Sequence, residues 1–301
     1  MRINLYISDM GKNSNIRVLG LRQFDIDDRQ FYVNTLSAHL LPSHLHINTP
    51  HKHDFFAAIL FTAGSGIHEI DFNTYSVKPG AMFLLSPGQT HNWKLSDDCE
   101  GMIFFHSQDF YDTHYIHDTV KDYPFFSSTQ NQVAVYLDEP AFGEIENLFR
   151  KIHQVFSDDQ VKRKQMVLSL VTQIYINVEN YVSAGSPVSV NEHSSYYLKF
   201  LRFENLVEEN FRKERSANKY AEWMHITPKH LNRINKLIVN KTSSEIIADR
   251  IVLEAKRMLI YARNNFNEVG DALGFNDYAH FSKLFKNKTG LTPTDFSKKY
   301  S

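Results

Sequence analysis

The chain has 301 residues, with 33 Lys and Arg, 34 Asp and Glu and one cysteine, Cys99. A single cysteine excludes a disulfide-stapled scaffold, and no apolar run approaches the roughly 18 residues of a membrane-spanning helix. The net charge of −1 is unevenly distributed, because residues 196–301 carry 19 Lys and Arg against 12 Asp and Glu, a net +7. The remaining 195 residues therefore carry −8, and the basic third is the part suited to nucleic acid.

The N-terminal part has the pattern of a β-domain. Its first residues, MRINLYISDMGK, lack the apolar core of a secretion signal, so we expect a cytoplasmic protein. Between Arg17 and Tyr136, short runs rich in Phe, Tyr, Val and Ile are broken by Gly, Pro, Asn and Asp. This pattern predicts antiparallel strands in a sandwich or barrel, and we assign residues 1–138 to this domain.

Residues 139–184 change to a helical period. An apolar stripe at i, i+3, i+4 and i+7 spacing comprises Val167, Leu170, Val171, Ile174, Val178 and Tyr181. Such a stripe must be buried, and we take it as a candidate dimer contact, with packing on the chain's own strands as the alternative. The following Ser-rich stretch with Gly and Pro predicts a linker over 185–195 and a separate domain over 196–301.

The last third contains two copies of one pattern, a helix, a tight turn, a polar N-cap and a second helix. In the first copy Ser216 caps one helix, His225 and Ile226 form the turn, and Thr227 followed by Pro228 starts the next helix. The helical period places Leu231, Ile234 and Ile238 inward. The outward residues of this helix are Lys229, Asn232, Arg233 and Lys236.

In the second copy Gly274 supplies the turn and Asp277 the cap. Phe281, Leu284 and Phe285 are expected to face inward. The outward set is then Tyr278, Ala279, Ser282, Lys283 and Lys286. Arg, Asn, Ser and Lys read base edges or pair with phosphate, and Ala contacts thymine methyls, so both faces suit a DNA major groove.

A continuous helix from about Ser244 to Tyr261 joins the two copies. Its length of roughly 27 Å could hold two recognition helices near the ~34 Å repeat of the groove. The alternative is a plain helical bundle whose basic face is only solvated.

These residues resemble the AraC/XylS transcription regulators. The most specific stretch is 269–296, which is similar to that family's second helix-turn-helix, while 226–236 and 254–260 resemble its first recognition helix and linker helix. The resemblance places Lys229, Asn232, Arg233, Tyr278, Ala279, Ser282 and Lys283 at base-facing positions. Asn235 stands where the family usually has Phe, which should weaken packing there. Gly270 stands where Ala is usual, at about 1 kcal/mol of helix propensity.

Residues 51–93 resemble the cupin-type sensor domain of such regulators, through His51-x-His53, Gly64, Pro79-Gly80 and Pro87-Gly88-x-x-His91. The resemblance implies an antiparallel β-barrel. Cupin enzymes hold a metal with these histidines and a glutamate, but Ala57 and Ala58 stand at the two glutamate positions. We therefore expect no metal or cofactor and a pocket in which a small molecule contacts His51, His53, Phe55, His91 and Trp93. Buried structural histidines and a three-imidazole metal site are the alternatives.

Other reactive residues are assigned no chemistry. His106, His114 and His117 are interpreted as solvated loop histidines. The acids beside Cys99 argue against a redox role. There is no P-loop, GxSxG or HExxH motif, so we expect no enzyme.

The sequence thus predicts a DNA-binding transcription regulator of α+β multidomain architecture. Its expected partners are double-stranded operator DNA, a small-molecule effector, RNA polymerase and a second copy of the chain, with no membrane. The family resemblance favours activation and a sugar or related metabolite. The alternatives are a metal-dependent cupin enzyme with a helical appendage and a regulator whose β-domain only dimerises or binds a protein.

Overall fold

The computed structural model describes residues 17–24, 30–43, 49–114, 119–127, 132–157, 161–184, 195–260 and 264–300. Its described residues divide into two compact units, Arg17–Arg250 and Ile251 onward, with the boundary inside a helix. The N-terminal dodecapeptide, His117 and residues 185–194 of the expected linker lie outside the described residues.

The N-terminal strands of the first unit form two five-stranded sheets. The first sheet contains, in spatial order, β1 (Arg17–Leu19), β3 (His51–His53), β8 (Thr90–Leu95), β5 (Gly66–Ile70) and β6 (Asn73–Val77). The second contains β10 (Ala134–Tyr136), β7 (Ala81–Leu85), β4 (Phe56–Ala63), β9 (Glu100–His106) and β2 (Phe31–Thr35). All neighbours pair antiparallel except β1 with β3. The β-rich domain is confirmed, but the expected closed barrel is not, because no ladder among the described strands joins the two sheets.

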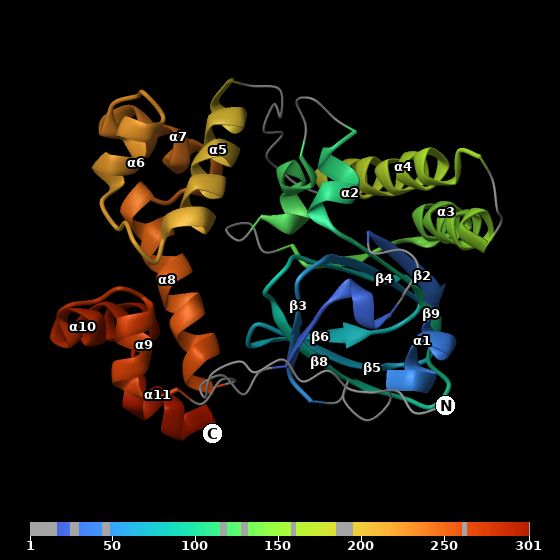
Figure 1. The fold of residues 1–301 in the computed structure, drawn as a ribbon, viewed down its shortest axis with the longest axis horizontal. Helices are drawn as coiled ribbons and strands as arrows, with labels where there is room; N and C mark the ends of the chain where they lie inside the picture. Colours follow the sequence, from blue (N-terminus) through green and yellow to red (C-terminus); the bar gives the residue numbers. More distant parts are fainter. Residues whose placement is uncertain are drawn as a thin grey trace. The chain divides into compact units, whose positions relative to one another are not determined.

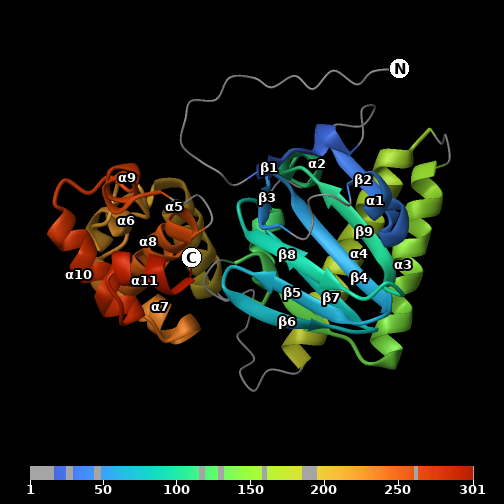
Figure 2. The same ribbon diagram turned by 90° about the horizontal axis from the view of Figure 1, so that it is seen from below.

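Strand β4 shows why this sandwich has two cores. Alternate side chains point to opposite faces of a strand. Phe56, Ala58 and Leu60 belong to one cluster of buried residues, and Ala57, Ile59 and Phe61 belong to the other. Both faces of this central strand are therefore covered, one by helices and one by the first sheet (Figure 2).

The helices on the second sheet are α3 (Glu139–Ser157) and α4 (Arg163–Ala184). In α4 the predicted apolar stripe is buried in the same cluster as Phe56 and Phe104 of the sheet, except that Tyr181 is partly buried and packs against that cluster. This confirms the alternative prediction, that the stripe packs on the chain's own strands. The prediction that the stripe forms a dimer contact is wrong. Shorter elements are η1 (Leu21–Gln23), α1 (Leu36–Ser43), α2 (Gln108–Asp112), η2 (Val120–Asp122) and η3 (Pro124–Phe126).

The rest of the first unit holds α5 (Ser195–Asn210), α6 (Ala217–Trp223), α7 (Pro228–Val239) and the start of α8 (Ser243–Ile260). Helix α5 packs against α6 and α7 (Figure 1). The second unit contains the rest of α8 with α9 (Phe266–Ala272), α10 (Tyr278–Thr289) and α11 (Pro293–Tyr300). Both helix pairs stand where the sequence predicts them. No helix among the described residues is long and apolar enough to cross a membrane.

Candidate nucleic-acid interface and ligand-binding core

The caps of the two candidate recognition helices form largely as predicted. Thr227 accepts a hydrogen bond from the His230 amide at 3.2 Å, and Asp277 accepts one from the Ala279 amide at 2.8 Å. Ser216 occupies the N-cap of α6 but makes no side-chain cap bond, and its own amide donates to Glu214 instead. His225 adopts a positive φ of 54° in the first turn. These local signals set where α7 and α10 begin.

On α7 the inward and outward faces follow the helical period. Leu231 and Ile234 are buried, and Lys229, Arg233 and Lys236 are exposed. The helix contains no carboxylate, so its outer face presents positive charge and hydrogen-bond donors. This is the arrangement needed for phosphate and base-edge contacts.

Arg233 is engaged by two neighbouring rings. Its Nη2 donates to the Tyr196 hydroxyl oxygen at 2.6 Å and lies 2.9 Å from His230 Nδ1. The guanidinium also lies 5.4 Å from the centre of the Tyr196 ring. Because a guanidinium only donates, His230 Nδ1 is the acceptor of this contact. Desolvation and the charges of Arg233 and Lys199 lower the pKa of His230. The sequence interpretation missed Tyr196, which lies in the first turn of α5.

Asn232 was predicted to face the bases, and in the structure it also stabilises the junction with α8. Its Oδ1 accepts from both the backbone amide and the hydroxyl of Ser243, each at 2.9 Å, and so caps the start of α8. Asn235 is fully buried, and its Nδ2 donates to the Ser243 hydroxyl at 3.0 Å. Where the family usually packs a Phe, this chain joins α7 to α8 by hydrogen bonds.

On α10, Phe281 and Phe285 are buried, whereas Leu284 is only half-buried. Ala279, Lys283 and Lys286 are exposed, and Ser282 is partly exposed. This helix also carries no carboxylate.

Tyr278 explains the unusual Gly270. A Cβ at position 270 would lie 2.8 Å from the Tyr278 ring, so the ring can rest on α9 only because Gly270 has no side chain. The Tyr278 hydroxyl also donates to Asp271 at 2.5 Å, and that bond raises the pKa of Tyr278. Glycine at position 270 is therefore required for the packing of Tyr278, a predicted base-facing residue.

The sensor residues meet between the two sheets. His51 and His91 are directly paired in register on β3 and β8, and ligand atoms of His51, His53 and His91 all lie within 4.8 Å of one another. Phe55 stacks on His53 with ring centres 4.5 Å apart, and Trp93 lies 5.6 Å from His91. All five predicted effector residues are thus brought together, and all five are buried.

A fourth imidazole, His68 of β5, was missed by the sequence interpretation. Its Nε2 shares a 2.9 Å hydrogen bond with His91 Nδ1, and His91 Nε2 lies 3.2 Å from His53 Nε2. Burial lowers the pKa of His51, His53, His68 and His91, so these rings are neutral at pH 7. Neutral imidazoles both donate and accept, which suits a polar ligand.

The chemistry of His51, His53 and His91 is also compatible with metal binding. His51 Nδ1 donates to the Thr49 carbonyl at 3.0 Å, which leaves its Nε2 lone pair free. Three neutral imidazoles can occupy three positions around Zn, Fe or Ni. Ala57 is buried in the same intersheet cluster and supplies no carboxylate.

His106 corrects the expectation of solvated loop histidines. It is fully buried in β9, its Nδ1 donates to the Ser107 carbonyl at 2.9 Å, and its Nε2 accepts from the Tyr175 hydroxyl at 2.7 Å. Burial lowers its pKa to about 4. His114 is exposed, as expected. Cys99 is buried, and burial raises the pKa of its thiol.

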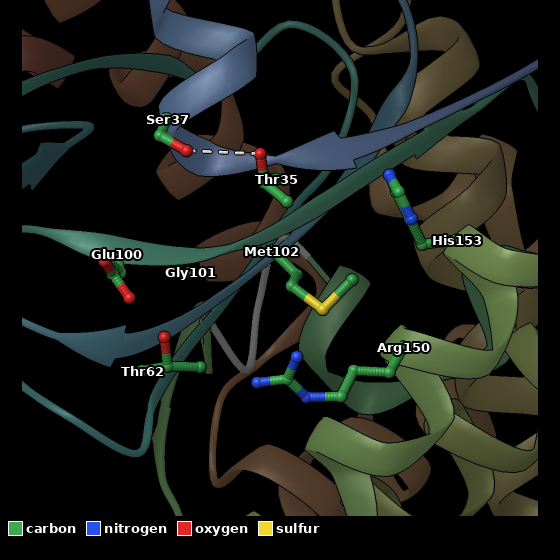
Figure 3. Close-up of a pocket in the computed structure, with 8 residues that line it drawn as sticks. All are labelled: Thr35, Ser37, Thr62, Glu100, Gly101, Met102, Arg150 and His153. Atoms are coloured by element: carbon green, nitrogen blue, oxygen red, sulfur yellow. Dashed lines mark hydrogen bonds between the residues drawn. The ribbon is translucent and has the colours of Figure 1, made fainter.

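A separate cavity of about 350 Å³ lies where α3 approaches the ends of β2, β4 and β9 (Figure 3). Its lining residues are Thr35, Ser37, Thr62, Glu100, Gly101, Met102, Arg150 and His153. Arg150 pairs with Glu146 of its own helix, and Glu100 adds a second carboxylate. One arginine against two carboxylates leaves a net negative charge here, so the cavity has no net attraction for an anion.

Comparison with known proteins identifies both parts of the chain. Residues 34–161 match the family model of the AraC-like ligand binding domain, and residues 220–299 match that of a helix-turn-helix domain. The chain is 21% identical to the HTH-type transcriptional activator RhaS of Mannheimia succiniciproducens, over 81% of this chain and 87% of that protein. It is 18% identical to the activator RhaR of Enterobacter sp., over 82% and 86%.

A solved structure of ToxT from Vibrio cholerae aligns with 90% of this chain and 99% of its own, at 10% identity and a TM-score of 0.40. The two family models cover the β-sandwich and the paired recognition helices in the order that the fold displays. The chain is a member of the AraC family of transcription regulators, with an AraC-like ligand-binding domain followed by a DNA-binding helix-turn-helix domain.

Proposed function

We propose that this regulator activates transcription from operators that α7 and α10 read in successive major grooves. The observation that carries the proposal is the pair of capped helices whose outer faces present Lys229, Arg233, Lys283 and Lys286 without a carboxylate. Activation is supported by the relatives RhaS and RhaR, which are transcriptional activators. An activator of this kind would contact RNA polymerase and work in the cytoplasm beside the DNA.

The effector proposed for the intersheet core is a small polar metabolite such as a sugar. The imidazoles of His51, His53 and His91 can each donate to or accept from a hydroxyl group. Phe55 and Trp93 supply aromatic walls. A site with apolar walls and a few convergent polar groups is the usual form of a metabolite pocket.

A homodimer remains part of the proposal, with residues 139–184 as the dimerisation segment. Because the apolar stripe of α4 is buried, the contact must use the outer side of these helices. There Met166 and Ile176 are exposed.

Selection of binding sites from random duplex DNA by the full chain tests the proposal directly. A regulator should enrich one consensus sequence, and replacement of Lys283 and Lys286 by Ala should weaken binding to it. A chain that enriches no sequence, or binds all duplexes equally, is not a sequence-specific regulator.

The second candidate function is a metal-dependent cupin enzyme, favoured by the convergence of His51, His53 and His91. Bound metal would act there as a Lewis acid held by these three rings. Metal analysis of the purified protein separates the candidates. Stoichiometric Fe, Mn or Ni that is lost in His51→Ala and His91→Ala would favour the enzyme, whereas metal-free protein with an enriched DNA consensus favours the regulator.

A further inference from the structure

The contacts of Arg233 occupy one particular nitrogen. A guanidinium Nη2 carries two hydrogens, and in this structure its two acceptors are the Tyr196 hydroxyl oxygen at 2.6 Å and His230 Nδ1 at 2.9 Å. Both hydrogens of Nη2 are therefore used inside the protein. The Nε–H and the two hydrogens of Nη1 make no hydrogen bond to other described residues.

This choice of nitrogen matters for reading DNA. Arginine recognises guanine by two parallel hydrogen bonds to O6 and N7. The two donors come either from Nη1 and Nη2 or from Nε and Nη2, so each fork includes Nη2. In the position seen here, Arg233 can therefore donate single hydrogen bonds to a base, but it cannot donate either pair of parallel bonds to guanine.

The ring of Tyr196 makes further contacts that keep Arg233 in this position. The Arg233 guanidinium lies 5.4 Å from its centre, and Lys199 Nζ lies 5.9 Å from it. Tyr196 also packs edge-on against His230, with ring centres 5.5 Å apart. One tyrosine of α5 thus contacts two residues on the first turns of the recognition helix.

We propose that Tyr196 is a specificity-determining residue that holds Arg233 in a closed position, and that two-bond reading of a guanine requires its release. This inference rests on the proposed role of Arg233 in base reading. Operator DNA must compete with the tyrosine hydroxyl for Nη2. The affinity for the specific site is therefore lower than it would be without the hydrogen bond between Tyr196 and Arg233. A DNA site without the matching guanine does not break this hydrogen bond.

The position of Tyr196 links this contact to the sensor. It is the second residue of α5, directly after the segment that the sequence predicts to be a linker. The same helix carries Glu204, which accepts hydrogen bonds from Ser127 of the β-rich domain. A movement of α5 that follows a change in the sensor would shift the Tyr196 hydroxyl relative to Arg233.

The test is Tyr196→Phe in the full chain, measured by fluorescence anisotropy on a duplex carrying the selected consensus site. Phenylalanine keeps the ring beneath the guanidinium and removes only the acceptor oxygen. We expect the specific duplex to bind roughly 3- to 10-fold more tightly, the range of one lost hydrogen bond. Binding to a scrambled duplex should not change.

Two companion variants make the result decisive. In an Arg233→Ala background the Tyr196→Phe change should have no effect, because there is no guanidinium to release. Tyr136→Phe, which removes an exposed hydroxyl that donates to the Ser76 carbonyl in the β-rich domain, is the matched control and should leave DNA binding unchanged.

The outcomes separate this inference from the proposed function. If Arg233→Ala weakens specific binding but Tyr196→Phe leaves it unchanged or weakens it, the closed position is refuted and base reading stands. Equal tightening in the presence and absence of Arg233 also refutes it, because Tyr196 then acts by another route. If Arg233→Ala binds the consensus as tightly as the parent chain, both the base-reading role and the closed position are wrong.

Discussion

Ser127 of the β-rich domain donates its hydroxyl to the carboxylate of Glu204 on α5, at 2.8 and 2.9 Å from the two oxygens, and both residues are buried. A buried carboxylate is costly unless its oxygens accept hydrogen bonds. The pair therefore joins two segments that are 77 residues apart in the chain.

Removing this donor should destabilise the protein. We expect Ser127→Ala to lower the free energy of unfolding by about 1–3 kcal/mol, because the carboxylate stays buried with one donor fewer. Urea denaturation followed by circular dichroism measures the change. Ser65→Ala, at an exposed serine, serves as the control; equal stability of the two variants would mean that Glu204 does not depend on Ser127.

Arg233 should contribute to the specificity of DNA binding. Arg233→Ala is expected to cost about 1–3 kcal/mol on the selected site and to relax the preference for one base. Anisotropy titrations against single-base variants of the site measure both effects. Arg150→Ala removes an exposed arginine on α3 and should change neither affinity nor preference.

Salt dependence provides a separate test of the basic helix faces. Each phosphate contact by Lys releases counterions, so the logarithm of affinity should fall linearly with the logarithm of salt concentration. Lys283→Ala and Lys286→Ala should each reduce the slope by about 1 if the side chain pairs with phosphate. An unchanged slope in both variants would exclude α10 from the phosphate interface.

Buried His106 predicts acid sensitivity. Because its pKa is lowered to about 4 in the folded protein, the unfolded chain binds the proton more tightly, and stability is lost as the pH falls below the unfolded value of about 6.5. Between pH 7 and 5 this residue alone should cost roughly 2 kcal/mol.

Urea denaturation of His106→Gln and the parent at pH 7, 6 and 5 measures that difference. The variant should lose less stability on acidification than the parent, although it starts from a lower value because its core packing is altered. His114→Gln, at an exposed histidine, should follow the parent curve. Parallel curves for all three proteins would show that His106 does not resist protonation.

Local signals in the sequence predicted the helix starts well. Thr227-Pro228 and Asp277 act through neighbouring amides, so their geometry follows from adjacent residues. The resemblance to a cupin-type sensor domain also placed His51 and His91 in one site, and the pairing of β3 with β8 brings these two histidines together.

Contacts between distant elements were the part that the sequence did not reveal. His106 resembled a loop residue because its hydrogen-bond partner, Tyr175, lies 69 residues later in the chain. Tyr196 and His68 were missed for the same reason, since their partners lie on other helices and strands. The prediction of a barrel was wrong because the pattern of side chains along a strand shows which face is buried, but not whether the edges of two sheets pair with each other.

The hydrogen bonds that Ser243 makes with Asn232 and Asn235 have a consequence for the reading of DNA. An apolar side chain in a core tolerates a small rotation of its helix, whereas a hydrogen bond loses strength quickly when its angle changes. In this chain the two asparagines therefore set the rotation of α7 about its own axis. They act on the side of α7 that faces the start of α8, and in that way they set which side chains the helix turns outward.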